Sequence, residues 1–392
     1  MNKNILKSGI QSFISKNIDT DIVSVLLKKP IFEGVAPKEL AEQIESKKKC
    51  GKKLPTWFKT LGIYYPKKLS VEQASSEITA RYKAQIVTGK SLIDLTGGLG
   101  VDSYFFSHKI TSVLHCEIDR ELSEIASHNF TIFGAENIEM FFGDGVAFLQ
   151  KTNRYFNWLF LDPSRRNKKK GKVFLLSDCS PNVPEYLDLL FSKSDSILLK
   201  TSPILDITAG IDKLQFVKEV HIVAVNNEVK ELLWVMKKDF IGEITIKTIN
   251  FSKQAHQVFD FRLSEEKETN SEISSPLNYL YEPNAAIMKS GGFKTIGSRF
   301  LLKKLHEHTH LYTSNKLIVF PGRRFEIEKC IPYNKNDLKT LGVKKANITT
   351  RNFPDSVVTI RNKFKIKDGG EIYLFFIKNL NEKHLVLICR KI

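Results

Sequence analysis

The feature that most constrains this chain is the glycine-rich segment Asp94-Leu-Thr-Gly-Gly-Leu-Gly100. The apolar run that leads into it is typical of a buried parallel strand that ends near Leu95. The three glycines permit positive φ angles and leave no Cβ to keep a ligand from the backbone, and residues 101–108 can then begin a helix. Strand, glycine turn and helix together predict an α/β fold with a site for a nucleotide cofactor. A plain connection between a strand and a helix is the alternative.

Acidic residues at the ends of the next predicted strands support the cofactor site. Glu117 ends the second strand about twenty residues after the glycines, where a carboxylate can accept hydrogen bonds from both ribose hydroxyls. Asp144 follows the third strand and offers the acceptor oxygens that an adenine amine requires. Asp162 follows the fourth strand. The predicted strands of this sheet cover residues 92–95, 110–117, 137–142, 156–161, 196–201, 220–225 and 244–249.

One predicted helix, over residues 71–84, has Ser70 as its expected N-cap and lies just before the first strand. In an open α/β sheet this helix would cover the ligand crevice, so Ser76, Thr79 and Lys83 are candidates to contact the ligand. An ordinary helix surface is the alternative. The other predicted helices cover residues 10–14, 22–27, 37–44, 120–130, 183–191, 228–237, 281–288, 298–306 and 336–342.

This ordered set of motifs resembles the class I S-adenosylmethionine-dependent methyltransferases over residues 71–265. Residues 94–100 match the first motif of that family, Glu117 its ribose acid, Asp144 its adenine-side acid, and Asp162-Pro-Ser-Arg165 its motif after the fourth strand. The resemblance implies a Rossmann-like sheet and S-adenosyl-L-methionine as the cofactor. It also implies a set of cofactor-binding residues, namely Asp94, Thr96, Gly97, Gly98, Gly100, Glu117 and Asp144.

The segment Asp162-Pro-Ser-Arg165 is the predicted reaction centre. It resembles the Asp-Pro-Pro-Tyr and Asp-Pro-Pro-Arg signatures of nucleic-acid amino methyltransferases, in which the acid and a neighbouring carbonyl hold an exocyclic amine, and Ser164 departs from the second proline. Methyl transfer from a sulfonium has an activated leaving group, so the protein mainly aligns donor and acceptor. We expect Asp162 to position the acceptor and Pro163 to stiffen the turn, with Ser164 and Arg165 in the same catalytic segment. A plain turn aspartate is the alternative.

Three further features resemble bacterial methyltransferases that carry a THUMP-like domain: residues 162–166, the segment Lys200-Thr-Ser-Pro-Ile-Leu-Asp206 and a basic C-terminal tail. The resemblance implies an N-terminal helical cap and a small C-terminal α+β module, ferredoxin-like plus THUMP-like. The acidic, polar stretch after residue 265 predicts a linker. The predicted domains are residues 1–70 (helical), 71–265 (methyltransferase), 266–276 (linker), 277–321 (ferredoxin-like) and 322–392 (THUMP-like).

The net charge of +17 lies at the ends of the chain, with +8 on residues 1–70, −5 on 71–288 and +14 on 289–392. Such a distribution fits an enzyme core delivered to a polyanion, and a solvated basic surface is the alternative. Residues 165–172 hold six cations beside the expected reaction centre, and residues 361–367 alternate cationic and apolar side chains, which predicts a strand with one basic face. A solvated loop and a lysine-protected edge strand are the respective alternatives.

We therefore predict an enzyme that methylates a structural RNA, such as tRNA or rRNA, delivered by the basic C-terminal domain. One alternative is a non-catalytic RNA-binding protein that retains the methyltransferase scaffold, and another is a small-molecule or protein methyltransferase. A nicotinamide dehydrogenase fits less well, because the turn reads Gly-Gly-Leu-Gly instead of G-x-G-x-x-G.

The sequence lacks the signals typical of membrane, secreted, disulfide-rich and metal-binding proteins. No run of about eighteen apolar residues and no secretory signal is present, so we expect no membrane partner and a cytoplasmic location. The five cysteines are scattered without a C-x-x-C pair, and the alternate histidines at 306, 308 and 310 would scatter their rings on a helix. Neither a disulfide framework nor a metal site is predicted.

Overall fold

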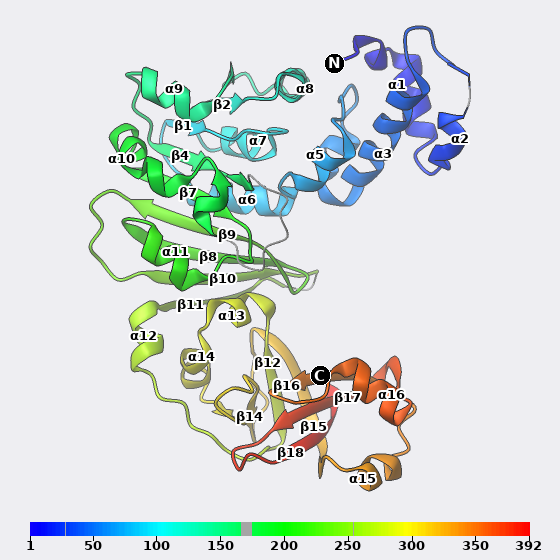
Figure 1. Ribbon diagram of the computed structural model, residues 1–392, viewed down its shortest axis with the longest axis vertical. Helices are drawn as coiled ribbons and strands as arrows, with labels where there is room; N and C mark the ends of the chain where they lie inside the picture. Colours follow the sequence, from blue (N-terminus) through cyan, green and yellow to red (C-terminus); the bar gives the residue numbers. More distant parts are fainter. Residues whose placement is uncertain (28, 166–174, 254) are drawn as a thin grey trace. The chain divides into compact units, whose positions relative to one another are not determined.

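The computed structural model describes residues 1–27, 29–165, 175–253 and 255–392 (Figure 1). Most of the cationic segment 165–172 therefore lies outside the described residues. The chain forms two compact units: unit 1 comprises Met1–Val217 and Leu233–Ile241, and unit 2 comprises Lys218–Leu232 and Gly242–Ile392. Within the described part of the chain, no helix is both long and apolar enough to cross a membrane.

Unit 1 begins with short helices followed by one long one. The elements are η1 (Lys3–Leu6), α1 (Ser8–Lys16), α2 (Ile22–Leu26), α3 (Pro37–Lys53) and α4 (Pro55–Lys59). Pro37 occupies the first turn of α3, and Glu39 accepts a hydrogen bond from the Ala36 amide at 2.8 Å, which satisfies a free N–H at the helix start. The lysine-rich run 47–53 forms the last two turns of α3. Trp57, in α4, is fully buried.

The predicted helix 71–84 is wrong in its extent, because it is two helices, α5 (Lys68–Gln73) and α6 (Glu77–Ile86). The break follows from Ser76, whose hydroxyl accepts a hydrogen bond from the Thr79 amide and so caps α6. Ser70 lies inside α5 and caps no helix. The segment between the two helices is extended at Ala74 and Ser76, and Ser75 between them contacts Asp102.

The main sheet has nine strands in the order β11-β10-β8-β9-β7-β4-β1-β2-β3. The pairs β3–β2, β2–β1, β1–β4, β4–β7 and β8–β10 are parallel, and β10–β11 is antiparallel. The chain runs from β1 outward to β3 and returns to β4 on the other side of β1, which creates a switch point where α/β sheets bind ligands. The strands are β1 (Ser91–Asp94), β2 (Ser112–Glu117), β3 (Ile138–Phe142), β4 (Trp158–Leu161), β7 (Ser196–Thr201), β8 (Val217–Val225), β9 (Glu228–Lys237), β10 (Thr245–Phe251) and β11 (Gln257–Arg262).

Helices follow most of the parallel strands, as expected for alternating strand and helix. They are α7 (Val101–Ser107), α8 (Arg120–Ile132), α9 (Gly145–Lys151), α10 (Val183–Lys193) and α11 (Ile207–Lys213). After β4 the chain forms a two-residue strand β5 (Ser164–Arg165), and β6 (Cys179–Ser180) pairs with it after the short helix η2 (Leu176–Asp178).

The helix predicted over residues 228–237 is wrong, because these residues form strand β9. Asn226 and Asn227 have φ angles of 51° and 64° and form a two-residue turn between β8 and β9. Asparagine tolerates this left-handed conformation better than most residues, and such turns fit the twist of a hairpin. The unbroken burial of residues 231–236 is that of a central strand.

Unit 2 contains a seven-stranded sheet in the order β13-β14-β12-β15-β18-β17-β16. Strand β12 (Tyr279–Pro283) pairs with β15 (Gly322–Pro332), so one sheet continues across the expected boundary at residue 321. The other elements are α12 (Leu263–Glu268), α13 (Ala285–Ser290), α14 (Phe293–Arg299), β13 (Lys303–Lys304), β14 (Tyr312–Ser314), α15 (Lys335–Thr340), β16 (Lys345–Arg351), α16 (Val357–Phe364), β17 (Lys367–Lys378) and β18 (His384–Lys391).

Both faces of this sheet are covered by hydrophobic cores. Along β17, Phe375 and Ile377 point into one core while Leu374 and Phe376 point into the other, as the two-residue period of a strand requires. The first core also contains Leu280 and others from residues 279–321. The second lies under α15 and α16.

Two expectations for the secondary structure of unit 2 are corrected. The helix 298–306 ends at Arg299 as α14, and Leu301 has a φ of 52° before β13 begins. The basic strand face expected over 361–367 is absent, because this segment ends α16 and turns at Lys365 with a φ of 54°. The expected linker 266–276 starts inside α12, where the Glu266 carboxylate accepts hydrogen bonds from two amides at the start of α14.

Candidate active site

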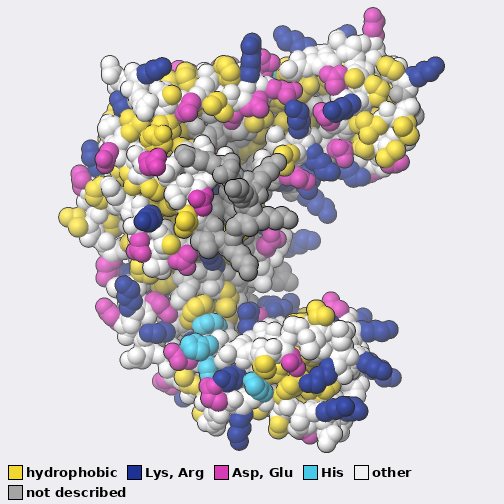
Figure 2. Space-filling model, in the orientation of Figure 1, with side chains coloured by type: hydrophobic (Ala, Val, Ile, Leu, Met, Phe, Trp, Pro, Cys, Tyr) yellow, Lys and Arg dark blue, Asp and Glu magenta, His cyan; other side chains and the backbone are white. Residues whose placement is uncertain are grey.

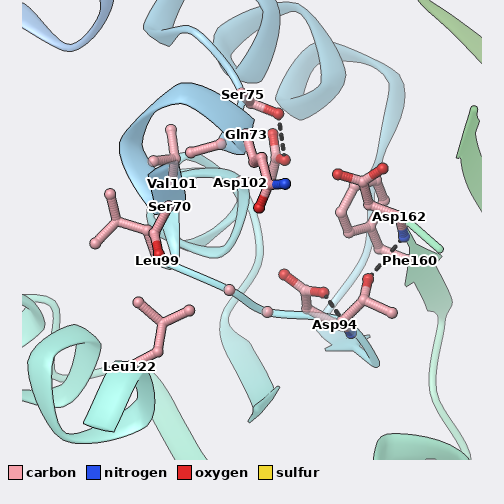
Figure 3. Close-up of a pocket in the computed structure, with 14 residues that line it drawn as sticks. Ser70, Gln73, Ser75, Asp94, Leu99, Val101, Asp102, Leu122, Phe160 and Asp162 are labelled. Carbon is pink, nitrogen blue, oxygen red and sulfur yellow. Dashed lines mark hydrogen bonds between the residues drawn. The ribbon is translucent and has the colours of Figure 1, made fainter. Parts of the chain in front are cut away.

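A cavity opens at the carboxyl ends of β1 and β4, at the switch point of the main sheet (Figure 3). Five residues predicted from the sequence line it, namely Asp94, Thr96, Gly97, Gly98 and Asp162. The remaining lining residues are Ser70, Gln73, Ala74, Ser75, Leu99, Val101, Asp102, Leu122 and Phe160. Among the described side chains, those of Glu117, Asp144, Pro163 and Ser164 do not line the cavity, and Gly100 does not either. The side chain of Arg165 lies outside the described part of the structure.

Asp94 ends β1 and is only 1% exposed. Its carboxylate accepts hydrogen bonds from the Thr96 amide at 3.1 Å and from the Ser103 hydroxyl at 2.6 Å. Burial is the largest influence on this group and raises its pKa to about 7, even though both hydrogen bonds favour the charged form. Asp94 is therefore poised between its neutral and its charged form near neutral pH.

The glycine turn is packed tightly against the side chains of His115 and Phe130. The His115 ring lies under Gly97, where an added Cβ would come within 2.1 Å of the ring, so that only glycine fits. His115 Nδ1 is 2.9 Å from the Ser103 hydroxyl, and burial lowers the pKa of the ring to about 3, which keeps it neutral. Gly100 has a φ of 80° at the start of α7, and a Cβ there would meet Phe130 at 2.3 Å.

Glu117, at the end of β2, is held against the glycine turn. Its two carboxylate oxygens accept hydrogen bonds from the Gly98 amide and the Asp119 amide, each at 2.7 Å. A carboxylate has about four acceptor positions, so two remain for a ligand. The side chain is thus oriented by the backbone beside the turn, although it forms no part of the cavity wall.

Asp144 follows β3 as predicted, and the structure shows it as the N-cap of α9. One of its oxygens accepts hydrogen bonds from the Val146 amide at 2.8 Å and the Ala147 amide at 3.2 Å. The side chain is exposed. A Cβ on Gly145 would lie 2.6 Å from the Leu95 carbonyl oxygen, so the turn after β3 packs directly against the end of β1.

Asp162 extends from β4 toward the cavity. Its amide donates a hydrogen bond to the Thr96 hydroxyl at 2.7 Å, which ties the ends of β4 and β1 together. Its carboxylate contacts the ammonium of Lys200, the residue near the end of β7. Pro163 is buried, and Ser164 is exposed and pairs through its backbone with Ser180.

A helix over the crevice was expected from the sequence, but the residues of α5 to α7 that line the cavity, among them Ser75 and Asp102, were missed. The Ser75 hydroxyl donates a hydrogen bond to Asp102 at 2.6 Å, and the fully buried Lys83 ammonium lies 3.0 Å from Ser75 and 3.1 Å from the other Asp102 oxygen. Of the predicted contacts on this side, Lys83 acts through Asp102, while Ser76 and Thr79 form the α6 cap. The acid at 102, in the first turn after the glycines, was the available signal.

The cavity is acidic. Figure 3 shows Asp94, Asp102 and Asp162 around one space, and the lysines that contact them are Lys83 at Asp102 and Lys200 at Asp162. Three carboxylates around one small space favour a ligand that carries positive charge. No group of three or more His, Cys, Asp or Glu side chains among the described residues is arranged to hold a metal ion.

Comparison with solved structures extends these observations to the whole chain. The crystal structure of a provisionally assigned methyltransferase from Porphyromonas gingivalis W83 matches with a TM-score of 0.89 and 33% identity, over 99% of this chain and 98% of that one. The chain belongs to the methyltransferase family with a THUMP-like domain. The predicted fold class, a Rossmann-like α/β sheet with a ferredoxin-like and THUMP-like module, is confirmed.

Other comparisons cover parts of this THUMP-like methyltransferase. Family models of a ferredoxin-like domain and a THUMP-like domain match residues 279–321 and 322–391. An rRNA methylase from Streptococcus thermophilus matches 42% of this chain and 98% of its own with 13% identity and a TM-score of 0.30. TrmK from M. capricolum, in complex with S-adenosyl-homocysteine, matches 41% and 69% with 12% identity and a TM-score of 0.33. Comparison with curated proteins gave no match.

Proposed function

We propose that this protein transfers a methyl group from S-adenosyl-L-methionine to a structural RNA, such as tRNA or rRNA. The observation that carries the proposal is the cavity at the switch point, in which a glycine turn faces Asp94, Asp102 and Asp162. The cofactor has a sulfonium and an ammonium group against one carboxylate, so its net positive charge suits this acidic cavity. Membership of a methyltransferase family supports the same reaction class.

The residues present fit this cofactor. The backbone of Gly98 is open toward the ligand side, because the atom nearest to an added Cβ would be 4.0 Å away. We assign Glu117 to the ribose hydroxyls and the exposed Asp144 to the adenine amine, with Asp94 and Asp102 facing the cationic amino-acid end. The bound cofactor would supply an activated methyl group, whose transfer leaves a neutral thioether.

On the acceptor side, Asp162 would accept a hydrogen bond from an exocyclic N–H and so orient the nitrogen lone pair. The Thr96 hydroxyl fixes the backbone of Asp162 at 2.7 Å, and buried Pro163 limits the turn that follows. Alignment is the main task of the protein in a displacement of this kind, so a rigid strand end is the suitable support.

The RNA part of the proposal rests on unit 2. Residues 289–392 hold 22 Lys and Arg against 8 Asp and Glu, and Figure 2 shows Lys and Arg side chains spread over the part of this unit that carries α15 and α16. The cations are scattered over helices and loops, which favours sequence-independent contact with phosphates. A cytoplasmic location, expected from the sequence, belongs to the same proposal.

Two measurements test the proposal. Calorimetry should show binding of S-adenosyl-L-methionine, and RNA from a strain that lacks the gene should accept labelled methyl groups from the purified protein, with the modified nucleoside identified by mass spectrometry. Absence of cofactor binding would favour the non-catalytic RNA-binding alternative. Methylation of small molecules or proteins, with RNA left unmethylated, would favour the alternative of a small-molecule or protein methyltransferase.

A further inference from the structure

Asp94 differs from the other two acids of the cavity in its partners. The Asp102 and Asp162 carboxylates each contact a lysine ammonium, whereas no Lys or Arg among the described residues forms an ion pair with Asp94. Its partners are two neutral donors, the Thr96 amide at Oδ1 and the Ser103 hydroxyl at Oδ2. A carboxylate has about four acceptor positions, so two remain, and Figure 3 shows the Asp94 carboxylate directed into the space that the three acids surround. The charge of Asp94 is therefore available to a cationic ligand.

The Ser103 hydroxyl is itself held from its other side by His115. Ser103 lies in α7, and its oxygen is 2.6 Å from Asp94 Oδ2 and 2.9 Å from His115 Nδ1. His115, in β2, is fully buried, and its other ring nitrogen, Nε2, has no hydrogen-bond partner in the described part of the chain. The three side chains form a continuous series of contacts from the core behind the glycine turn to the cavity.

The single proton of the Ser103 hydroxyl sets the direction of this series. When Asp94 is ionised, the 2.6 Å contact requires that proton, because a carboxylate has only acceptor oxygens. The Ser103 oxygen can then only accept from His115, so Nδ1 must carry a proton. Burial lowers the pKa of His115 to about 3, so the ring is neutral and has no proton left for Nε2. His115 thus donates to Ser103, and Ser103 donates to Asp94.

Packing leaves the His115 ring little freedom to turn away from Ser103. One side of the ring lies against the backbone of Gly97, where even an added Cβ would come within 2.1 Å. The Phe130 ring meets it edge-on, with 5.4 Å between the ring centroids. Because Nδ1 is held toward Ser103 in this way, the hydrogen bonds have a fixed geometry before any ligand arrives.

The series opposes the other influences on Asp94. Burial raises the pKa of Asp94 most, and the hydrogen bond from Ser103 is the largest influence that lowers it. The charges of Asp102 in α7 and Asp162 after β4 raise this pKa, and the Thr96 amide lowers it. A donor that itself accepts a hydrogen bond is polarised and donates more strongly. His115 therefore reinforces the bond that favours the charged form of Asp94.

We propose that Ser103 and His115 are positioning residues, which hold the Asp94 carboxylate ionised and oriented toward the ammonium group of the cofactor. This inference rests on the proposed function and deepens it, because it selects Asp94 among the three acids as the partner of that ammonium group. Neither Ser103 nor His115, both within the described part of the chain, lines the cavity. Both residues act through Asp94.

The first test is the tautomer of His115, measured by ¹⁵N NMR of the full-length protein with labelled histidine at pH 8, where Asp94 is mostly ionised. The His115 signals are identified by their loss in His115→Asn. We expect a ring protonated at Nδ1 and unprotonated at Nε2, and Ser103→Ala should shift both signals because Nδ1 loses its acceptor. A wild-type ring protonated at Nε2 would overturn the proposal, and this measurement needs no variant that might fail to fold.

The second test is the titration of Asp94 in the cofactor-free protein, followed by ¹³C NMR of its carboxyl carbon. Ser103→Ala removes a hydrogen bond to the charged form and should raise the midpoint by about one pH unit. His115→Leu removes only the polarising donor and should raise it by about 0.3 unit. His115→Asn keeps an N–H donor and should stay closer to the wild type.

The matched control for this titration is Phe130→Leu. Phe130 packs against the same glycine turn and against the His115 ring, but it forms no hydrogen bond with the series. Its Asp94 midpoint should equal that of the wild type. The proposal fails if Ser103→Ala leaves the midpoint unchanged, or if Phe130→Leu raises it as much as Ser103→Ala does, since loosened packing would then explain both.

Cofactor binding separates this inference from the proposed function. With a midpoint near pH 8 instead of 7, Ser103→Ala should bind S-adenosyl-L-methionine about fivefold more weakly than the wild type at pH 7 and approach it at pH 9. The expected tautomer and titration in a protein that does not bind the cofactor would contradict the proposed function alone. Cofactor binding by a protein whose His115 is protonated at Nε2 would contradict the positioning role alone.

Discussion

Each unit contains a group of buried and half-buried charged side chains, and the two groups differ in the ratio of carboxylates to cationic side chains. The cavity of unit 1 presents Asp94, Asp102 and Asp162 with two contacting lysines. In unit 2, Glu282 on β12 has a side chain only 4% exposed and contacts two arginines: Arg323 Nε lies 2.6 Å from one carboxylate oxygen, and an Arg351 terminal nitrogen lies 3.0 Å from the other.

The contrast suggests how to distinguish an acid that binds a ligand from one that supports the fold. The single negative charge of Glu282 is shared by two arginines, so the group as a whole is positive and a further cation would be repelled there. The cavity of unit 1 has more carboxylates than contacting lysines, and burial has already raised the pKa of Asp94. Excess negative charge in a cavity is retained at a cost in stability, which is typical of a binding site.

The largest expected effect is on unit 2. Glu282→Gln leaves two arginines without their shared carboxylate and should lower the free energy of unfolding of unit 2 by about 3–5 kcal/mol. This loss is measured by chemical denaturation in which the hydrogen exchange of the β12 amides reports on the unfolding of unit 2. Glu326→Gln, at an exposed position on the neighbouring strand β15, is the matched control and should change the value by less than about 0.5 kcal/mol. Equal effects in both would contradict a structural role for Glu282.

The acceptor-side acid should behave in the opposite way. Asp162→Ala should reduce methyl transfer to RNA by about 100-fold, because the acceptor loses its alignment, while cofactor affinity and stability stay near wild type. Incorporation of labelled methyl groups into RNA, with calorimetry on the same preparation, measures both. Asp188→Ala, at an exposed position on α10, serves as the control. An equal loss of cofactor affinity in Asp162→Ala would contradict the assignment of this residue to the acceptor.

The glycine turn should tolerate no side chain at Gly97, where the His115 ring packs against the backbone. Gly97→Ala places a Cβ 2.1 Å from the His115 ring and should destabilise unit 1 by about 1–3 kcal/mol. Gly9→Ala, within α1 and with no atom within 4 Å of the new Cβ, should instead stabilise by about 0.4–1 kcal/mol. Thermal unfolding of the two variants measures the difference, and a Gly97→Ala protein as stable as Gly9→Ala would show that the turn is not tightly packed.

Glu117 sharpens the comparison within the cofactor site. Glu117→Ala removes both the acceptor assigned to the ribose and the brace on the Gly98 amide, and should weaken S-adenosyl-L-methionine binding by about tenfold. Glu117→Gln keeps an acceptor oxygen and should lose less. Calorimetry provides both values, and unchanged affinity in the alanine variant would remove Glu117 from the binding site.

The smallest expected effect concerns pH. Asp94 has a pKa of about 7, so it is mostly protonated at pH 6 and mostly ionised at pH 8. The ionised form attracts the cationic cofactor, hence affinity should rise several-fold over this interval, with protons released on binding below pH 7. Calorimetry in buffers of different ionisation enthalpy detects that release. Asp94→Asn should lose the part of the pH dependence of cofactor affinity that is due to this carboxyl group. An unchanged pH dependence in the variant would show that another group is responsible.

The sequence predicted the parts of this site that lie along one strand and its following turn. Apolar runs located β1, β2, β3, β4 and β7, and the polar residues after them meet because parallel strands end at one edge of a sheet. Pairings between distant segments were not predictable in this way. The contact of Ser75 with Asp102 and Lys83 depends on how α5, α6 and α7 meet, and the contact of Lys200 with Asp162 depends on the neighbouring positions of β7 and β4.

The misassigned segments share a physical cause. Residues 228–237 and 361–367 have patterns that suit both a helix and a strand, and a local feature decided each case. The Asn226-Asn227 turn made the first a hairpin strand, and the Ser356 hydroxyl, which accepts a hydrogen bond from the Thr359 amide at 3.1 Å, started a helix through the second. Caps and turns of this kind are short signals that hydrophobic periodicity does not contain.

The pairing of β12 with β15 has a consequence for how unit 2 folds. Residues 279–321 and 322–391 match separate family models, yet they share a sheet and the core that joins Leu280 to Phe325. Neither segment can open without exposing the interior of the other, so the two should melt cooperatively, and amides on both strands should exchange with the same protection.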